Sequence, residues 1–558
     1  MPFKSPFPDL DIPQTDLLSY LFGGRAVSDE PLWFNSSQPE RNLSPKRALQ
    51  LVKRLGAGLS QLGMERGDVI LMFTPNHIFV PVAYLGIVGS GRVFSGANPS
   101  YTAQELAYQL SNSTAKAILA HPVVLDRALE ASERVGIPKE RIFQFSDEVE
   151  PTRKGIKDWT CLLGTSQQAD SWNWPTLTPK EASQTIATIN YSSGTTGLPK
   201  GVCVSHSNLI ANLEQSYFMR YVGTPYLKSG NAPQERWVGF LPLYHAYGQL
   251  YTILMALKLG NPVYVMTEFN FERFLDTVSR FRITSLQVAP PVLVMLSKRP
   301  ETANYDLSSV EEIRCGAAPL SSELQNDCQK KFGIPIRQGW GMTELTCASI
   351  TMPSSSDNVE GTVGRLMPNS QCKLIDDEGR EVTSGTPGEL CIKGPNVCMG
   401  YWKNEKATRE TIQDGWLRTG DIAVRNQDGF FWIVDRKKEL IKVNGLQVAP
   451  AELEAVLLEN KHVADAAVVG ITLHGNELPR AYVVLQDQYK DKLRPIDIQN
   501  WTASRVSKHK RLEGGVVFIS EVPKLASGKI QRKVMREWAR RDAIDLEKTT
   551  EAKPMSKL

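Results

Sequence analysis

The sequence has little excess charge and no long apolar run, and both absences limit what the protein can be. Its 558 residues carry 64 lysines and arginines against 60 aspartates and glutamates, a formal net charge of +4. A nucleic-acid-binding protein shows a concentrated basic face, so this balance gives no reason to expect such a role. The most apolar stretch, 69–88, is broken by Pro75, Asn76, His77 and Pro81. It is therefore interpreted as a core strand and helix, not as an integral membrane segment.

Paired cysteines are missing as well. The eight cysteines are scattered, and no two have the C-x-x-C spacing, which argues against a zinc site and against a dense disulfide framework. A reducing compartment fits this usage best. Residues 1–8 contain three prolines where a signal peptide needs an apolar helix, so secretion is not expected.

The length predicts more than one domain, and the first part of the chain has the pattern of an α/β fold. Strands are predicted at 68–73, 93–96 and 115–120, with helices between them. One of these helices begins at Thr102 and has Glu105 three residues later, the spacing of a capping box. Strands that alternate with helices indicate a mostly parallel sheet.

The later part of the chain changes character twice. Residues 146–180 are polar and rich in tryptophan and proline, and are interpreted as a connecting segment. From about residue 360, turn dipeptides separate short strands such as 371–375 and 389–392. We therefore expect a large N-terminal domain, 1–436, of α/β layers with a small β-rich subdomain at about 360–435. A small, mobile α+β C-terminal domain, 437–540, and a flexible tail, 541–558, follow.

One stretch, 191–202, combines glycines, hydroxyls and a lysine in the manner of a phosphate-binding loop. Glycines let the backbone approach a ligand closely, while hydroxyls and a lysine add donors and positive charge. The spacing is not that of a P-loop NTPase, and no hydroxyl follows Lys200. A β-leaning run precedes the stretch and a helix is predicted to begin near 205–208, so we expect a strand, a loop and a helix. The candidate phosphate ligands are Ser192, Ser193, Gly194, Thr195, Thr196, Gly197 and Lys200; a solvated surface turn is the alternative.

Seven stretches together resemble the adenylate-forming superfamily of acyl-CoA synthetases, 4-coumarate-CoA ligases, firefly-type luciferases and adenylation domains of peptide synthetases. The resemblance is nearest to 4-coumarate-CoA ligase-like peroxisomal acid–CoA ligases. The stretches are 191–202, 241–248, 316–320, 338–344, 415–421, 433–442 and 523–530, in the order of the family. The resemblance implies an ATP-dependent, AMP-forming acid–CoA ligase, which makes an acyl-adenylate and then passes the acyl group to a thiol. Both steps concentrate negative charge on phosphoryl oxygens, which fixed cations and donors stabilise.

The resemblance also implies a role for each motif. The 191–202 loop holds the β- and γ-phosphates, and Thr195 or Thr196 together with Glu344 places Mg²⁺, a cation that prefers oxygen ligands. Asp421 accepts the ribose hydroxyls, and Arg436 adds to that grip. The residues expected around the adenine and phosphates are Gly316, Ala317, Ala318, Gly339, Trp340, Gly341, Met342 and Thr343, with Trp340 stacking where many relatives carry tyrosine.

The resemblance also implies that the two steps use different faces of the small C-terminal domain. Lys529 bridges the carboxylate and the α-phosphate during adenylation, and Lys438 is the hinge about which the small domain rotates. Rotation presents Lys442, Asn444 and Gly445 for thioester formation with coenzyme A, and Gly445 leaves room for a pantetheine arm. His245 lines the carboxylate site, and we assign it a positioning role and not that of a general base.

The sequence constrains the identity of the carboxylic acid substrate less than the reaction. Pocket positions carried over from 4-coumarate-CoA ligases are Tyr247, Val288, Ala289, Gly316, Gly339, Cys347 and Ala348. The segment 345–348 departs from the plant pattern, so aromatic, arylalkanoic and medium-chain acids all stay open. A luciferase-like oxidase and a stand-alone adenylation enzyme for a carrier protein are the alternatives. The final residues, Ser556-Lys557-Leu558, match a peroxisomal address read by an import receptor, so residence in the peroxisome is expected.

Overall fold

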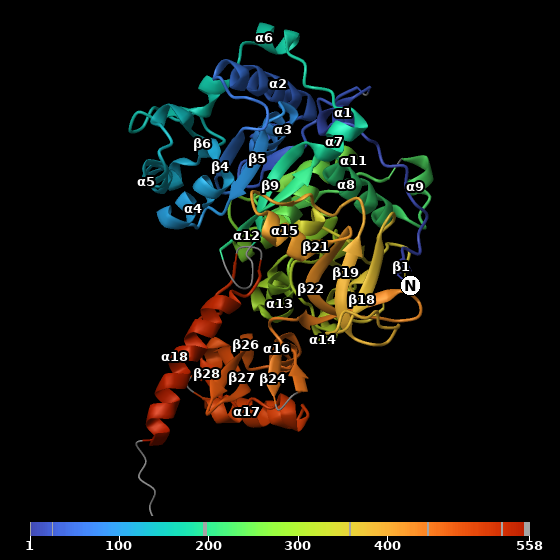
Figure 1. Cartoon of the computed structure of the whole chain (residues 1–558), viewed down its shortest axis with the longest axis vertical. Coiled ribbons are helices and arrows are strands. Elements are labelled where there is room, and N and C mark those ends of the chain that lie inside the picture. The colour runs from blue at the N-terminus through green and yellow to red at the C-terminus, as the bar shows by residue number, and fades with distance from the viewer. Residues whose placement is uncertain are drawn as a thin grey trace, which may run out of the picture.

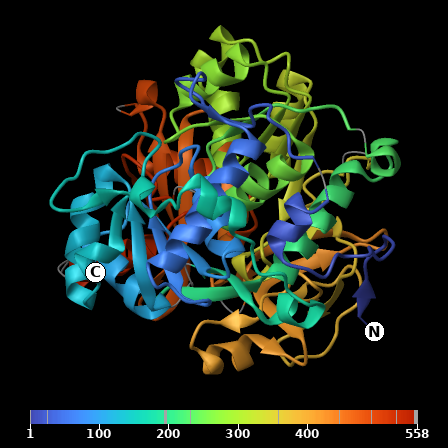
Figure 2. The same ribbon diagram turned by 90° about the horizontal axis from the view of Figure 1, so that it is seen from above.

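The computed structural model describes residues 2–24, 26–192, 198–230, 232–356, 359–443, 446–490, 492–525 and 528–551. A large N-terminal body lies above a smaller C-terminal part (Figure 1). Viewed from above, the early elements of the body lie beside its middle elements (Figure 2). None of the described helices is both long enough and apolar enough to cross a lipid bilayer.

The first sheet has eight strands, and most of them are parallel. Alternate residues of β4 (Val69–Phe73) face opposite sides. Ile70 and Met72 pack with helices α2 (Pro45–Gln61) and α3 (Val80–Gly89), whereas Leu71 and Phe73 pack with α4 (Ala103–Ser113) and α5 (Leu125–Val135). Both faces are therefore covered, which explains why this strand is continuously apolar. The other strands are β20 (Gly400–Tyr401), β10 (Lys200–Ser205), β9 (Ile186–Ser192), β5 (Val93–Ala97), β6 (Ala115–Ala120), β7 (Ile142–Gln144) and β8 (Lys157–Asp158).

The helices around this sheet begin largely where the sequence predicts. α2 (Pro45–Gln61) is capped by Ser44, and α4 (Ala103–Ser113) has the predicted capping box between Thr102 and Glu105. The remaining helices are α3 (Val80–Gly89), α5 (Leu125–Val135), α6 (Ser166–Ser171), α7 (Pro179–Gln184) and α8 (His206–Tyr221). Helix α6 lies in the segment 146–180 that was predicted to be only a connection, and α7 begins at its end; each helix begins with its own capping box.

The second sheet is longer and changes direction along its length. Its parallel half packs one face against α12 (Phe271–Arg280), α13 (Pro290–Lys298) and α14 (Ser322–Phe332). This half contains β2 (Trp33–Asn35), β12 (Val263–Val265), β11 (Trp237–Gly239), β13 (Ser285–Val288), β14 (Glu312–Cys315) and β15 (Ile336–Trp340), with β3 (Asn42–Leu43) antiparallel at its edge. The antiparallel half contains β16 (Ile350–Thr351), β17 (Gly364–Leu366), β23 (Phe430–Arg436), β22 (Trp416–Arg425), β19 (Gly388–Lys393), β18 (Gln371–Ile375), β1 (Phe3–Lys4) and β21 (Ile412–Gln413). Most of the antiparallel half falls in the predicted β-rich region, about 360–435, but β1 and β16 come from outside it.

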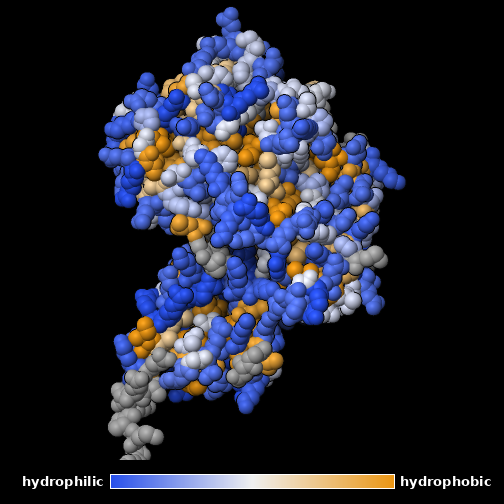
Figure 3. All heavy atoms as spheres, in the orientation of Figure 1, coloured by the Kyte–Doolittle hydropathy of each residue, from blue (hydrophilic) through white to orange (hydrophobic). Residues whose placement is uncertain are grey.

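The C-terminal part has its own small core of α and β elements. It contains β24 (Ile441–Val443), β25 (Leu446–Val448), α16 (Pro450–Glu459), β26 (Val463–Leu473), β27 (Asn476–Leu485), α17 (Pro495–Ala503), β28 (Val516–Phe518) and α18 (Arg532–Glu551). Helix α18 continues past residue 540, where a flexible tail was expected. Figure 3 shows that the surface is hollowed on one side where this part joins the body.

Candidate active site

A cavity in the N-terminal body collects most of the predicted adenine, acyl-pocket and catalytic residues. Lys529, which comes from the C-terminal part, also lines it. The predicted residues that line it are His245, Tyr247, Gly316, Ala317, Gly339, Trp340, Gly341, Met342, Thr343, Cys347, Ala348 and Lys529.

Three residues expected at the adenine and ribose form one connected group. The indole Nε1 of Trp340 donates a hydrogen bond of 2.8 Å to Oδ2 of Asp421, and Nε of Arg436 lies 3.3 Å from Oδ1. Asp421 and Arg436 are register partners on β22 and β23, so the sheet fixes their separation. Burial raises the pKa of Asp421, against the opposing effects of Arg436 and of the Trp340 hydrogen bond. The carboxylate is thus held in place by two partners at a site that disfavours its charge.

Lys529 reaches the cavity from a tight turn. The turn is closed by a hydrogen bond from Leu525 N to Lys529 O and contains Gly528 with φ +83°. A Cβ at Gly528 would lie 3.0 Å from Cβ of Ala289, so the turn packs directly on the residue before α13. Burial lowers the pKa of Lys529, as does the charge of Arg436, while Asp421 and Glu344 oppose that shift. The Lys529 ammonium group is therefore influenced by the charges of both Asp421 and Glu344.

His245 is neutral in this environment. Burial, and next to it the charge of Lys529, lowers the pKa of His245 to about 3. Its Nδ1 accepts a hydrogen bond of 3.3 Å from the backbone N–H of Tyr247. Since Nδ1 is an acceptor, the ring proton belongs on Nε2. The side chain can donate a hydrogen bond but is a poor base at neutral pH.

Glu344 is tied to the hairpin that carries the glycine-rich loop. The hydroxyl of Tyr401 donates 2.9 Å to Oε1 of Glu344, and Nζ of Lys200 lies 4.8 Å from the centroid of the Tyr401 ring. Tyr401 is held there because β20 pairs with β10. Within the described ranges no group of three or more His, Cys, Asp or Glu side chains could hold a metal by itself. A buried carboxylate such as Glu344 is nonetheless a fitting single protein ligand for Mg²⁺, which usually binds through one or two carboxylates plus substrate phosphates.

The predicted loop lies in a hairpin and does not lead into a helix. β9 and β10 are antiparallel, and Ser192 faces Lys200 across them. Helix α8 begins at His206, as predicted, but 200–205 forms a strand before it that pairs with β9. The predicted strand–loop–helix order is therefore wrong by one strand. Ser193, Gly194, Thr195, Thr196 and Gly197 lie outside the described residues.

The acyl side of the cavity is built from small residues and two tyrosines. The hydroxyl of Tyr247 donates 3.2 Å to the carbonyl of Arg314, so its proton is engaged by the protein. The segment carrying Cys347 and Ala348 is pinned by two buried asparagines. Asn212 Nδ2 and Asn396 Nδ2 donate 2.7 and 2.9 Å to the carbonyl of Ala348.

Val288 and Ala289 do not belong to this lining, contrary to expectation. Val288 packs in the apolar core beneath the sheet, and its carbonyl accepts from Gly316 N at 3.1 Å. Ala289 faces the Gly528 turn. Both residues shape the site from behind, since β13 alternates and directs the Val288 side chain to the core.

The sequence as a whole matches one family over most of its length. The model of AMP-binding enzymes matches residues 26–402, and the model of their C-terminal domain matches residues 452–529. The chain belongs to the AMP-binding enzyme family.

Related proteins agree with this assignment. The phenylacetyl-CoA ligase epaB of Aspergillus niger is 36% identical over 541 residues, covering 95% of this chain and 97% of that protein. A probable 4-coumarate–CoA ligase of Dictyostelium discoideum is 34% identical over 550 residues, covering 96% and 97%. The solved structure of the anthranilate CoA ligase AuaEII with anthranoyl-AMP matches with a TM-score of 0.84 at 24% identity. It covers 96% of this chain and 99% of that one, which confirms the expected fold.

Of the residues that we assign to coenzyme A in this AMP-binding enzyme, the structure describes Lys442, which does not line the cavity. Lys442 is exposed on β24, and its backbone N–H donates 2.9 Å to Glu477. Lys438 lies in the link that follows β23, two residues after Arg436. Asn444 and Gly445 are outside the described residues. Ala318 does not line the cavity, although its neighbour Ala317 does. Among the described residues, the structure thus brings those assigned to adenylation together around the cavity and leaves Lys442 outside its lining.

Several residues of the site escaped the sequence analysis. Tyr251, Arg314, Arg337 and Thr351 line the cavity, and Tyr401 supports Glu344. One signal was present: Glu312 and Arg314 are charged residues at alternate positions of an otherwise apolar strand. Because side chains alternate along a strand, Glu312 and Arg314 lie on the same face. Two buried charged side chains on one face indicate a polar site beside the strand.

Proposed function

We propose that this protein is an ATP-dependent, AMP-forming acid–CoA ligase. One observation carries the proposal: Lys529 of the C-terminal part lies in the cavity formed by His245, Trp340 and Thr343 of the body. A cation at that place is suited to a reaction in which a carboxylate attacks a phosphate.

The first step joins the acid to the nucleotide. A carboxylate oxygen attacks the α-phosphorus of ATP, the bond to the β-phosphate breaks, and pyrophosphate leaves. Lys529 holds the two negatively charged reactants together, and the Nε2–H of His245 positions the carboxylate. Glu344 and the hydroxyls of Thr195 or Thr196 would hold Mg²⁺, which neutralises phosphate charge when it is bound.

The second step transfers the acyl group to the thiol of coenzyme A. The sulfur attacks the acyl carbon, the carbon–oxygen bond to AMP breaks, and AMP leaves. Lys442, Asn444 and Gly445 are assigned to this step. The exposed position of Lys442 supports a rotation of the C-terminal part about Lys438 that exchanges Lys529 for Lys442.

The substrate that we propose is an aromatic, arylalkanoic or medium-chain acid. The lining of small residues and tyrosines accommodates a ring or a chain, and relatives named phenylacetyl-CoA ligase and 4-coumarate–CoA ligase support acids of this kind. Tyr247 cannot supply a donor to a ring hydroxyl while its proton is held by Arg314 O.

The test is pyrophosphate release and thioester formation across a panel of aromatic and aliphatic acids. An acid–CoA ligase gives both products with ATP and coenzyme A. Adenylation with no thioester from any acid would contradict the proposal. Light emission in oxygen would favour a luciferase-like reaction, and transfer only to a carrier protein would favour a stand-alone adenylation enzyme.

Residence in the peroxisome stays a prediction from the sequence, because Ser556-Lys557-Leu558 lies outside the described residues. A tagged protein without these three residues should remain in the cytosol. Unchanged import would mean that another signal acts.

A further inference from the structure

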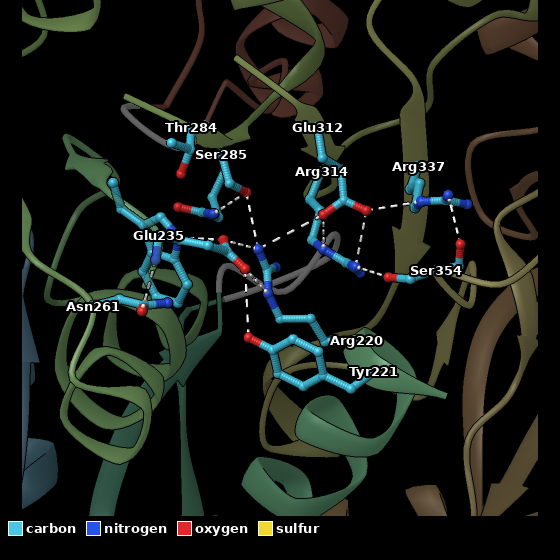
Figure 4. A network of polar contacts seen from close by, with 12 residues as sticks. Arg220, Tyr221, Glu235, Asn261, Thr284, Ser285, Glu312, Arg314, Arg337 and Ser354 are labelled. Carbon is cyan, nitrogen blue, oxygen red and sulfur yellow. Dashed lines mark hydrogen bonds and ion pairs between the residues drawn. The ribbon is translucent and has the colours of Figure 1, made fainter. Parts of the chain in front are cut away.

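The acyl side of the cavity ends at a buried layer of charge. Glu312 and Arg314 share one face of β14, and Arg337 is the register partner of Arg314 on β15. Figure 4 shows Glu312 between Arg314 and Arg337, with Arg220 of α8 reaching the same group. The opposite face of these strands is apolar and packs on the helices.

Most of the guanidinium nitrogens of Arg314 and Arg337 contact other protein groups. Arg314 Nε and Nη2 donate 2.8 and 3.0 Å to Glu312, and Nη2 also donates 2.7 Å to Ser354 Oγ. Arg337 Nε lies 2.8 Å from Glu312, and its Nη1 and Nη2 donate to carbonyls of Pro353, Ser354 and Ser356. Three arginines therefore hold one carboxylate. Burial disfavours its charge, yet Arg314, Arg220 and Arg337 together lower the pKa of Glu312.

The layer carries more positive than negative charge. Glu235 is the second carboxylate and pairs with Arg220, so three guanidinium groups face two carboxylates and one positive charge is left over. Arg314 is 7% exposed and lines the cavity. No described residue forms a hydrogen bond with its Nη1.

A hydrocarbon tail seated against Arg314 would leave its Nη1 without water and without a partner, which is unfavourable. An oxygen atom of the substrate would satisfy it.

We propose that Arg314 selects acids whose end remote from the reacting carboxylate carries a hydrogen-bond-accepting oxygen: a hydroxyl, a carbonyl or a second carboxylate. This inference rests on the proposed ligase function and narrows its substrate class. Arg314 acts on the far end of the acid, whereas Lys529 and His245 act on its carboxylate. The residue is therefore a determinant of specificity and takes no part in the chemical step.

The experiment compares matched acids that differ only at the remote end. Phenylacetate is assayed against its ring-hydroxylated and ring-carboxylated forms, and octanoate against its ω-hydroxy, ω-oxo and ω-carboxy forms. The measurement is kcat/KM from pyrophosphate release. Wild type should prefer at least one oxygen-bearing form in each series by about tenfold or more, the range for a hydrogen bond to a charged group. The form preferred in each series shows which of the three oxygen groups is recognised.

Two variants assign the preference to the residue. Arg314→Met should bring the ratio of kcat/KM values to about one, and Arg314→Lys should keep part of it. Arg337→Met is the matched control. It also removes one positive charge beside Glu312, but the guanidinium that it removes already contacts protein through all three nitrogens. It should keep the preference.

Two results would overturn the inference without touching the ligase function. One is equal use of plain and oxygen-bearing acids by wild type, a comparison that needs no variant to fold. The other is a loss of preference in Arg337→Met as large as that in Arg314→Met. Pyrophosphate release from no acid at all would overturn the ligase function together with the inference.

Discussion

The hydrogen bond from Trp340 to Asp421 gives a sharp test of how the nucleotide end of the cavity works. Trp340→Phe keeps an aromatic ring for stacking but removes the indole N–H that donates 2.8 Å to Asp421 Oδ2. Asp421 is only 5% exposed, and its other partner, Arg436 Nε, lies at the longer distance of 3.3 Å. A hydrogen bond to a charged group contributes about 1.5–3 kcal/mol. We expect KM for ATP to rise roughly tenfold or more.

Trp340→Phe should also change how KM for ATP depends on pH. Burial already raises the pKa of Asp421, and the Trp340 hydrogen bond is one of the effects that oppose this rise. Without it the pKa rises further, so more of the carboxyl is protonated as the pH falls. A protonated carboxyl accepts the ribose hydroxyls less well, and the defect should therefore grow on going from mildly alkaline to mildly acidic pH.

The assay is KM for ATP from pyrophosphate release at several pH values. Trp432→Phe is a matched control, because its indole Nε1 donates 3.0 Å to the carbonyl of Glu360, away from the cavity. If Trp340→Phe and Trp432→Phe have the same KM for ATP at every pH, the reasoning about Asp421 is refuted.

Two further predictions concern the acyl pocket and the junction between the parts. Gly316→Ala should fold, since a Cβ there would lie 3.5 Å from Gly339 O and 3.7 Å from the Tyr247 ring. It should lower kcat/KM for ring-bearing acids about tenfold while short unbranched acids change little, and equal effects on both would contradict the pocket assignment. Burial raises the pKa of Asp435 to about 6, above its value of about 3.9 in an unfolded chain. Its ionised form thus lowers the free energy of unfolding above pH 6, and this loss, at most about 3 kcal/mol, is relieved as pH falls toward 4. The difference in free energy of unfolding between wild type and Asp435→Asn, measured by thermal unfolding, should therefore change between pH 6 and pH 4. A difference that stays constant over this interval would contradict the assignment.

The sequence predicted those parts of the fold that depend on local physics. The capping box at Thr102 and Glu105 and the apolar strand predicted at 68–73, observed at 69–73, are confirmed, because each is specified by residues a few positions apart. The same logic failed for α6 and α7, which have six residues each and no room for an apolar repeat. Their capping boxes, Thr165 with Gln168 and Thr178 with Glu181, were the overlooked signal.

The family and the fold class were likewise predictable, but side-chain partnerships were not. Lys529 and Asp421 act in one electrostatic field because two domains meet, and no spacing along the chain encodes that. The bond between Trp340 and Asp421 joins residues on different strands. Strand β10 was missed because the glycine-rich loop was expected to lead directly into a helix, although β10 pairs with β9 on the other side of that loop.

The central claim is that Lys529 serves adenylation and leaves thioester formation to the other face of the C-terminal part. The direct measurement is both half-reactions of Lys529→Ala: pyrophosphate release from acid and ATP, and thioester formation from preformed acyl-adenylate and coenzyme A. The account predicts that the first is lost while the second is largely retained. Equal loss of both would contradict it.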